Sequence, residues 1–135
     1  MSSSIFIDTG YLIALIRKKD ALHPAALEAA ELYPGPFLTT DLILTELANS
    51  LAKPPCRRTV VSVIEKIRDE RNTTVVPFSS QGMTKAFSLF KSREDKTWGL
   101  IDCFSFVVME ENRIKQALTF DDHFRQAGFQ TPLLG

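Results

Sequence analysis

Short apolar segments alternate with longer stretches of helical periodicity along this chain. Runs of apolar and β-branched residues predict buried strands at residues 5–7, 37–39, 73–76 and 117–120, and residues 131–134 are the candidate for a fifth strand. Apolar residues at helical intervals predict helices at residues 11–16, 20–33, 41–52, 57–71, 81–93 and 100–110. In the helix at 81–93, we expect Phe87 and Phe90 to be the apolar anchors. Strands that alternate with helices favour a parallel sheet covered on both faces, so the predicted fold class is α/β.

Length and composition describe one globular unit. The chain has 135 residues, of which 44% are hydrophobic and 24% charged, so we expect a single domain over residues 1–135 with a substantial core. Sixteen basic residues balance sixteen acidic ones, which excludes a polybasic nucleic-acid coat but permits local patches. Cys56 and Cys103 cannot form a disulfide framework or a CxxC zinc site. Without a secretory signal or an apolar run of about 18 residues, the chain is expected to be cytoplasmic, with no membrane span.

Four acidic side chains lie where a parallel sheet collects its functional groups. Asp8 directly follows the first predicted strand, and Asp121 directly follows the fourth. Functional groups gather beyond the carboxyl ends of parallel strands, where the strand order reverses. Glu46 lies in the helix after the second strand, and Asp102 lies near the start of the most apolar helix. Structural interpretations stay open, since Asp8 and either Asp121 or Asp122 could cap helices, and Glu46 could lie on a helix surface.

Asp102 is the acid that is hardest to explain structurally. Its neighbours are almost all apolar: Leu100, Ile101, Cys103, Phe104, Phe106, Val107, Val108 and Met109. An unpaired buried carboxylate costs several kcal/mol. The helix N-terminus returns only roughly 0.3–1 kcal/mol, so Asp102 requires a cation, a cluster of donors or a proton. A structural ion pair and a functional role both meet this requirement, and we favour the functional role.

If the four acids converge, their site requires positive charge. Two carboxylates about 5 Å apart repel by roughly 3 kcal/mol at an effective dielectric constant of about 20. Oxygen ligands favour hard divalent cations, so the predicted ion is Mg²⁺ or Mn²⁺ rather than Zn²⁺. Neither His23 nor His123 is spaced as a ligand pair with another His or Cys, and both are interpreted as structural.

Four segments of the chain resemble the acidic motifs of PIN-domain nucleases. They are IFIDT (5–9), TDLILTELAN (40–49), WGLIDCFSF (98–106) and TFDDHF (119–124). A fifth segment, DALHPAA (20–26), is similar to the Asp/His stretch that opens an early helix in that family. Each motif alone is weak, but the four occur in order over nearly the whole chain. The pattern is most similar to that of the VapC-type toxins of bacterial and archaeal toxin–antitoxin pairs.

The resemblance implies a fold and an activity. The fold would be a three-layer α/β/α sandwich around a parallel sheet of four to five strands in the order 3-2-1-4-5, with Asp8 beside Asp121. The activity would be metal-dependent endoribonuclease cleavage, with Mg²⁺ or Mn²⁺ held by Asp8, Glu46, Asp102 and Asp121, the last in preference to Asp122. Such ions lower the pKa of a bound water, and a second ion roughly 3.5–4 Å away stabilises the leaving oxygen. The implied partners are RNA, a second copy in a homodimer and a small antitoxin whose tail occupies the acidic groove.

Neighbouring polar side chains are candidates to support these acids. Thr9, Thr119 and Asn49 would orient carboxylates through hydrogen bonds, and Asp122 would support Asp121. Hydrogen bonding to the local backbone explains the two threonines and the asparagine equally well.

Basic residues must flank an acidic site that binds RNA. The cluster expected to contact phosphates consists of Lys53, Arg57 and Arg58. A second cluster is diluted by Glu94 and Asp95, and it contains Lys91, Arg93 and Lys96. Either cluster could be a solvated helix end. Trp98 and most of the phenylalanines are assigned to the core rather than to base stacking.

Other function classes fit less well. Asp8-Thr9-Gly10 matches the signature of retroviral-type aspartic proteases, but these are all-β dimers and the residues that follow here are predicted to be helical. A receiver-like phosphoacceptor domain expects a lysine at the end of a late strand, which Thr119-Phe120-Asp121 lacks. The remaining alternative is a catalytically degenerate PIN-like module that binds RNA or a protein without cleavage.

Overall fold

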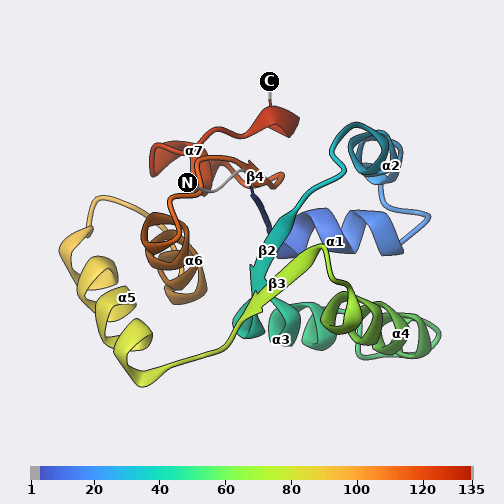
Figure 1. The fold of residues 1–135 in the computed structure, drawn as a ribbon, viewed down its shortest axis with the longest axis horizontal. Helices are drawn as coiled ribbons and strands as arrows, with labels where there is room; N and C mark the ends of the chain where they lie inside the picture. The colour runs from blue at the N-terminus through green and yellow to red at the C-terminus, as the bar shows by residue number, and fades with distance from the viewer. Residues whose placement is uncertain (1–3, 135) are drawn as a thin grey trace.

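A parallel β-sheet forms the centre of the computed structural model, which describes residues 4–134 (Figure 1). Its strands are β1 (Ile5–Ile7), β2 (Phe37–Thr40), β3 (Thr73–Val76) and β4 (Ala117–Leu118). They lie in the order β3-β2-β1-β4, and every pair is parallel. The strand order therefore reverses between β1 and β4, which confirms the predicted order for these four strands and the predicted α/β class.

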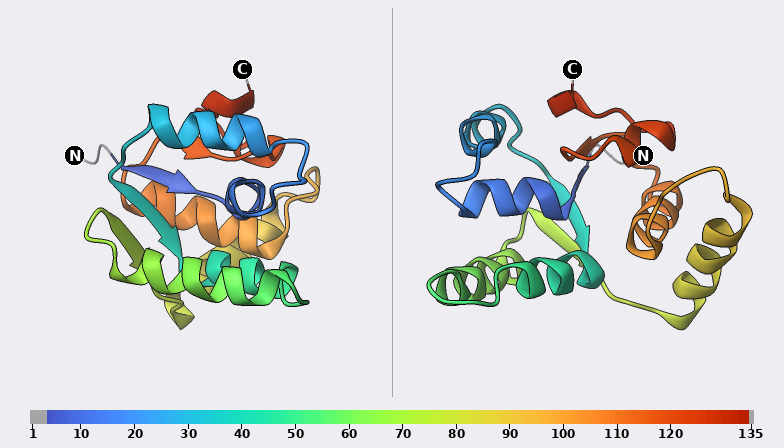
Figure 2. Two further views of the ribbon diagram at one scale, coloured as in Figure 1. Left: turned by 90° about the vertical axis from the view of Figure 1, so that its right-hand side faces the viewer. Right: turned by 180° about the vertical axis from the view of Figure 1, so that it is seen from behind.

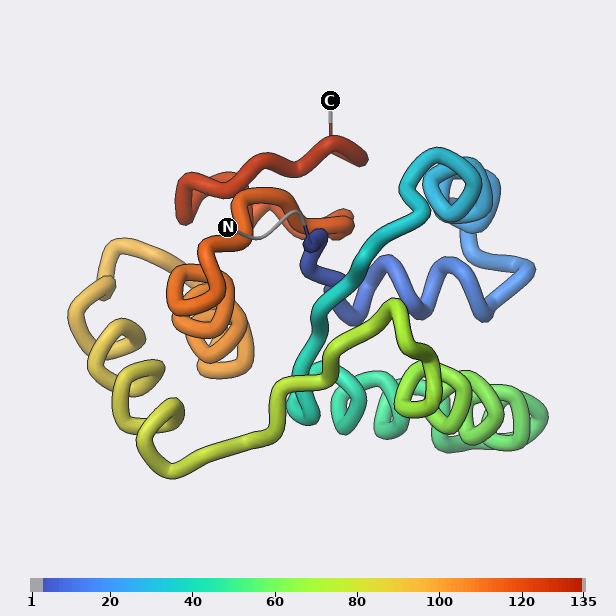
Figure 3. The backbone as a smooth tube through the Cα atoms, viewed as in Figure 1, coloured from blue at the N-terminus to red at the C-terminus, as the bar shows by residue number. Residues whose placement is uncertain are grey.

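Helices cover both faces of this sheet. They are α1 (Thr9–Ile16), α2 (His23–Leu32), α3 (Asp41–Ser50), α4 (Cys56–Asp69), α5 (Ser80–Ser92), α6 (Leu100–Glu111) and α7 (Asp122–Gln126). Helices α1 to α4 lie on one side and α5 and α6 on the other, which confirms the three-layer arrangement (Figures 1 and 2). Residues 77–79 connect β3 to α5 and cross along one edge of the molecule (Figure 3). Within residues 4–134, no helix has the length and apolar character needed to cross a membrane.

Helix α6 packs at the centre of the core, as its apolar sequence predicts. Its buried residues are Cys103, Phe104, Ser105, Phe106, Val108 and Met109. The ring of Phe106 meets that of Phe124 edge-on, with centroids 5.0 Å apart. Phe124 in turn lies 5.8 Å from Phe6 of β1. These contacts hold α6, α7 and the sheet together and fix the place of Asp102 in the first turn of α6.

Short polar side chains set the helix starts near the strand ends. Thr40, the last residue of β2, caps α3 by accepting a hydrogen bond from a backbone N–H of its first turn. Asp121 caps α7 in the same way, accepting from the N–H of His123 at 3.0 Å. Asp8 occupies the N-cap position of α1, but its side chain makes no capping hydrogen bond. Capping therefore accounts for Asp121 rather than Asp122, and it does not explain Asp8.

The prediction of a fifth strand at residues 131–134 is wrong. Pro132–Leu134 forms a 3₁₀ helix (η1), because proline has no N–H to donate to a strand ladder. A single parallel bridge, between Gln116 and Gln130, pairs the chain just before this segment.

The prediction that Phe87 and Phe90 anchor α5 in the core is also wrong. Their side chains are 51% and 44% exposed. Helix α5 instead turns Gly82 and the buried Ala86 toward the core. A Cβ atom on Gly82 would lie only 2.9 Å from a ring carbon of Phe104, so α5 comes close to α6 at the position where it has no side chain. Apolar spacing identified the helix but not the face that it buries.

Candidate active site

Thr119 connects the two acidic side chains that follow β1 and β4. The strands pair at Ile7 and Leu118, and the N–H of Asp8 donates to the carbonyl of Leu118 at 3.1 Å. The Thr119 hydroxyl donates to Oδ2 of Asp8 at 2.7 Å and accepts from the N–H of Asp121 at 3.0 Å. Because Thr119 is fully buried, it fixes the Asp8 carboxylate relative to the segment that carries Asp121.

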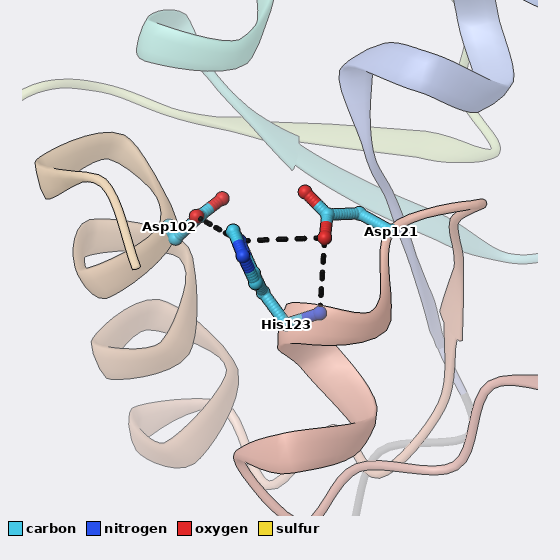
Figure 4. Close-up of side chains that lie close together, drawn as sticks. All are labelled: Asp102, Asp121 and His123. Carbon is cyan, nitrogen blue, oxygen red and sulfur yellow. Dashed lines mark hydrogen bonds and ion pairs between the residues drawn. The ribbon is translucent and has the colours of Figure 1, made fainter. Parts of the chain in front are cut away.

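The imidazole of His123 lies between Asp102 and Asp121, and the three side chains point toward one another (Figure 4). Its Nδ1 is 2.8 Å from Oδ2 of Asp102 and 3.3 Å from Oδ1 of Asp121. The backbone N–H of Gly99 donates to the same Asp102 oxygen at 3.0 Å. On the other side of the ring, Nε2 lies 3.3 Å from Oγ1 of Thr97. Asp102 therefore has the cluster of donors that its apolar surroundings require.

Glu46 joins this group through Thr9. The Thr9 hydroxyl donates a short hydrogen bond to Oε1 of Glu46, and Thr9 directly follows Asp8 at the start of α1. Glu46 lies on α3 and is half-buried. The structure thus brings Asp8, Asp102 and Asp121 together and places Glu46 beside them.

The Asp8 carboxyl is buried, and this changes its acidity. Burial raises the pKa of Asp8 from 3.8 to about 7, and the negative charges of Asp102 and Asp121 raise it as well. The hydrogen bond from Thr119 opposes this change by stabilising the ionised form. A negative charge at Asp8 is consequently unfavourable until positive charge is added to the site.

Positive charge is scarce around these acids. In the described part of the chain, no Lys or Arg forms an ion pair with Asp8, Asp102 or Asp121. Ligand atoms of Asp102, Asp121 and His123 lie within 4.8 Å of one another. A donor set made mainly of carboxylate oxygens suits Mg²⁺ or Mn²⁺, and one imidazole nitrogen adds to it. The residues present therefore fit a hard divalent cation.

Two of the expected supporting side chains lie apart from this network. Asp122 is exposed, and its carboxylate accepts hydrogen bonds from Arg125 at 2.9 Å and Gln126 at 3.1 Å. Asn49 is exposed one turn beyond Glu46 on α3. Thr9 and Thr119, by contrast, donate directly to carboxylates of the site.

The structure does not bring the first basic cluster to the acids. Lys53, Arg57 and Arg58 lie at the α3–α4 turn and the start of α4. Figure 1 and the right-hand view of Figure 2 show this turn at one end of the molecule and α5 at the other, with the sheet between them. The second cluster begins in the last turn of α5 and continues along the connection to α6, the helix that carries Asp102.

Sequence reasoning missed His123 as a member of the site. His123 has no His or Cys at the spacing of a ligand pair, and its partner Asp102 comes from a helix far away in the sequence. No local spacing in the sequence joins the two side chains, because their contact depends on how α7 packs against α6.

Comparison with known proteins agrees with this fold. The family model that matches is the PIN domain, over residues 5–130. The chain therefore belongs to the PIN-domain family.

Its relatives include a toxin ribonuclease. The 23S rRNA-specific endonuclease VapC20 of Mycobacterium tuberculosis is 27% identical over 125 residues, which cover 93% of this chain and 95% of the relative. The crystal structure of VapC20, a sarcin-ricin loop cleaving toxin, matches with a TM-score of 0.86 and covers 93% of this chain and 96% of that one.

Two more distant structures share the fold. A toxin–antitoxin complex from Klebsiella pneumoniae matches at 16% identity with a TM-score of 0.65 and covers 88% of each chain. FitAcB from Neisseria gonorrhoeae matches at 15% identity with a TM-score of 0.64, covering 94% of this chain and 95% of that one.

Proposed function

We propose that this chain is a metal-dependent endoribonuclease that hydrolyses RNA phosphodiester bonds and acts as the toxin of a VapBC-type toxin–antitoxin pair. The observation that carries the proposal is the convergence of Asp8, Asp102 and Asp121 with His123 at the ends of β1 and β4. Acids gathered without a Lys or Arg partner create a cation site. The name of the relative VapC20, a 23S rRNA-specific endonuclease, supports RNA as the substrate.

We assign the binding of Mg²⁺ or Mn²⁺ to Asp8, Glu46, Asp102 and Asp121. A divalent ion there would lower the pKa of a bound water and stabilise negative charge on the leaving oxygen. The burial that raises the pKa of Asp8 to about 7 supports this assignment, because a nearby cation would favour the ionised carboxylate.

The other side chains act on these carboxylates. Thr119 orients Asp8 through its hydroxyl, and Thr9 orients Glu46. The ring of His123 holds Asp102 from one side, while the Gly99 N–H holds the same oxygen. Pre-positioned acids need little rearrangement when a cation binds, which favours tight binding and correct placement of the reacting phosphate.

The partners follow from the same family resemblance. We infer a small antitoxin that blocks the acidic groove, and a homodimer as the working state. VapC20 is a sarcin-ricin loop cleaving toxin, and this similarity supports a toxin role for the present chain. A single domain and a cytoplasmic location stay predictions of the sequence.

The decisive experiment measures RNA cleavage. The purified full-length chain is incubated with an RNA that contains the bacterial sarcin-ricin loop, in Mg²⁺, Mn²⁺ or EDTA, and the products are resolved on a denaturing gel. We expect cleavage with either ion and none in EDTA. Asp102→Asn should slow cleavage by at least about a hundredfold, because it removes a charge from the site without changing the side-chain shape.

Asp122→Asn is the matched control, since the Asp122 carboxylate pairs with Arg125 outside the cluster. Its cleavage rate should stay within about twofold of the wild type. Equal rates for Asp102→Asn and the wild type would contradict the proposal. RNA binding without cleavage under any of the ions would instead assign the chain to the degenerate, non-cleaving class.

A further inference from the structure

A cleft opens beside the acidic site, between the last turn of α5 and the first turn of α6. Its volume is about 620 Å³, and its walls include Phe87, Phe90, Lys91, Lys96 and Cys103. We refer to it as the aromatic cleft. Cys103 directly follows Asp102, so the first turn of α6 borders both the cleft and the acidic site. Thr97, which contacts His123, directly follows Lys96 in the same connection.

The two phenylalanines present their rings to solvent. Phe87 is 51% exposed and Phe90 is 44% exposed, and their rings stack with centroids 6.4 Å apart and planes inclined by 25°. Because α5 packs on the core through Gly82 and Ala86, the fold does not depend on either ring. Exposed aromatic rings of this kind are the surfaces on which unpaired nucleobases stack.

A cation lies against this aromatic pair. The Nζ atom of Lys91 is 5.8 Å from the centre of the Phe87 ring. Among residues 4–134, Lys91 has no ion-pair partner within 4.0 Å, whereas Arg93 is paired with Asp95 at 2.9 Å. An ammonium group that is not neutralised, next to a stacking surface, suits a phosphate that follows a stacked base.

We propose that the aromatic cleft holds unpaired bases of single-stranded RNA beside the bond that is cut, with bases on Phe87 and Phe90 and a phosphate at Lys91. This inference rests on the proposed ribonuclease function and adds the place that the substrate occupies. Every base has an aromatic face, so such a cleft selects unstacked, looped RNA rather than a sequence.

The charge of the cleft favours RNA over a second copy of this chain. A twofold-symmetric contact through this face would bring the same patch of both copies together. The cleft is lined by three cationic side chains, Lys91, Arg93 and Lys96, and by one carboxylate, Glu94. Two faces that each carry this excess of positive charge would then approach each other, which is unfavourable. The negatively charged backbone of RNA, in contrast, complements it.

The test measures RNA affinity in the full-length protein. Binding of a fluorescein-labelled octa-adenylate is followed by fluorescence anisotropy in EDTA, which removes divalent ions and prevents metal-dependent cleavage. Phe87→Ala and Phe90→Ala should each weaken binding on the order of tenfold, because a stacking surface is lost. Phe87→Tyr and Phe90→Tyr keep the ring and should restore the affinity. Lys91→Ala should weaken binding and lower the slope of log affinity against log salt by about one.

Leu32→Ala is the matched control, because Leu32 is 64% exposed on α2, on the other side of the sheet. It should leave RNA affinity unchanged. Unchanged affinity in the two alanine variants, with unfolding midpoints like that of the wild type, overturns the proposal. A dimer that dissociates in Phe87→Ala by light scattering while RNA affinity is retained also overturns it, and assigns the face to a second copy.

The proposal for the aromatic cleft and the proposal of ribonuclease activity can be tested separately. If the wild type cleaves no RNA but its binding still depends on Phe87 and Phe90, the ribonuclease proposal fails and the cleft stands as an RNA site. If the wild type cleaves RNA and Phe87→Ala changes neither affinity nor KM, the cleft proposal fails and the ribonuclease proposal stands.

Discussion

The Asp8 side chain couples the stability of the protein to pH. Its pKa rises from 3.8 to about 7, mainly because the carboxyl is buried. Between these pH values the folded protein keeps a proton that the unfolded chain releases. The free energy of unfolding therefore falls as the pH rises from about 4 to about 7 and levels off above that range. At neutral pH and without a cation, the site is destabilised by its own charge.

Asp8→Asn should remove the loss of stability that ionisation of Asp8 causes. In EDTA at pH 8, we expect the variant to be more stable than the wild type by a few kcal/mol, since each tenfold change in proton affinity corresponds to about 1.4 kcal/mol. Near pH 3 the two proteins should be nearly equal, because Asp8 is then largely protonated in both the folded and the unfolded state. Urea unfolding at a series of pH values measures the difference.

Asp122→Asn serves as the control of opposite sign. Hydrogen bonds from Gln126 and Arg125 hold the pKa of Asp122 below its usual value, so loss of the Asp122 charge should not stabilise the protein at pH 8.

Parallel stability profiles for Asp8→Asn and the wild type between pH 4 and pH 8 would contradict the prediction for Asp8, because they would show that Asp8 does not titrate in this range.

The sequence allowed some site residues to be predicted and not others, for physical reasons. Asp8 and Asp121 were found because strand ends converge in any parallel sheet. Asp102 was found because a charge within an apolar helix has to be compensated. The contact of His123 with Asp102 depends on how α7 packs against α6, and no local pattern encodes that packing.

At the scale of elements, the close contact between α5 and α6 depends on a glycine. Helix α5 approaches α6 at Gly82, where a Cβ atom would lie 2.9 Å from Cε1 of Phe104 and 2.9 Å from Oγ of Ser79. Gly82→Ala should therefore destabilise the protein by about 1–2 kcal/mol through overpacking, despite the better helix propensity of alanine. Thermal unfolding with calorimetry measures the change.

Gly10→Ala is the comparison for this substitution. Gly10 also lies in a helix, α1. A Cβ atom added there would have no atom within 4 Å, apart from its chain neighbours and the backbone of the same helix. Alanine there should be neutral or stabilise the protein by up to about 1 kcal/mol. A Gly82→Ala protein as stable as Gly10→Ala would show that α5 and α6 separate easily.

The elements themselves were largely predictable, and the errors have clear causes. The strands at residues 5–7 and 73–76 have the predicted bounds. The failed strand at residues 131–134 contains a proline that cannot donate to a ladder. The buried face of α5 was predicted wrongly because apolar periodicity gives most weight to large residues. In the structure, the helix packs on the core through Gly82 and Ala86.

At the scale of the whole molecule, a cation at the site would tie separate elements together. Its proposed ligands come from the end of β1, from α3, from α6 and from the start of α7. Binding to the folded state alone stabilises it, by about 2.7 kcal/mol at a hundred times Kd. Mn²⁺ or Mg²⁺ should therefore raise Tm by several degrees. The rise should be larger at pH 8 than at pH 5, where protons compete at Asp8.

Asp102→Asn should abolish most of this rise in Tm, whereas Asp122→Asn should retain it. Equal increases in the wild type and Asp102→Asn would mean that the ion binds elsewhere. This measurement needs no RNA, so it tests the cation site independently of catalysis.

The connection between β3 and α5, which crosses from one helical layer to the other, divides the proposed ligands into two pairs (Figure 3). Asp8 and Glu46 precede it, and Asp102 and Asp121 follow it. A chain split there would give two inert fragments, joined in the sheet only where β4 docks on β1. Ribonuclease activity would return when the fragments reassemble, which makes this protein a natural scaffold for a complementation reporter.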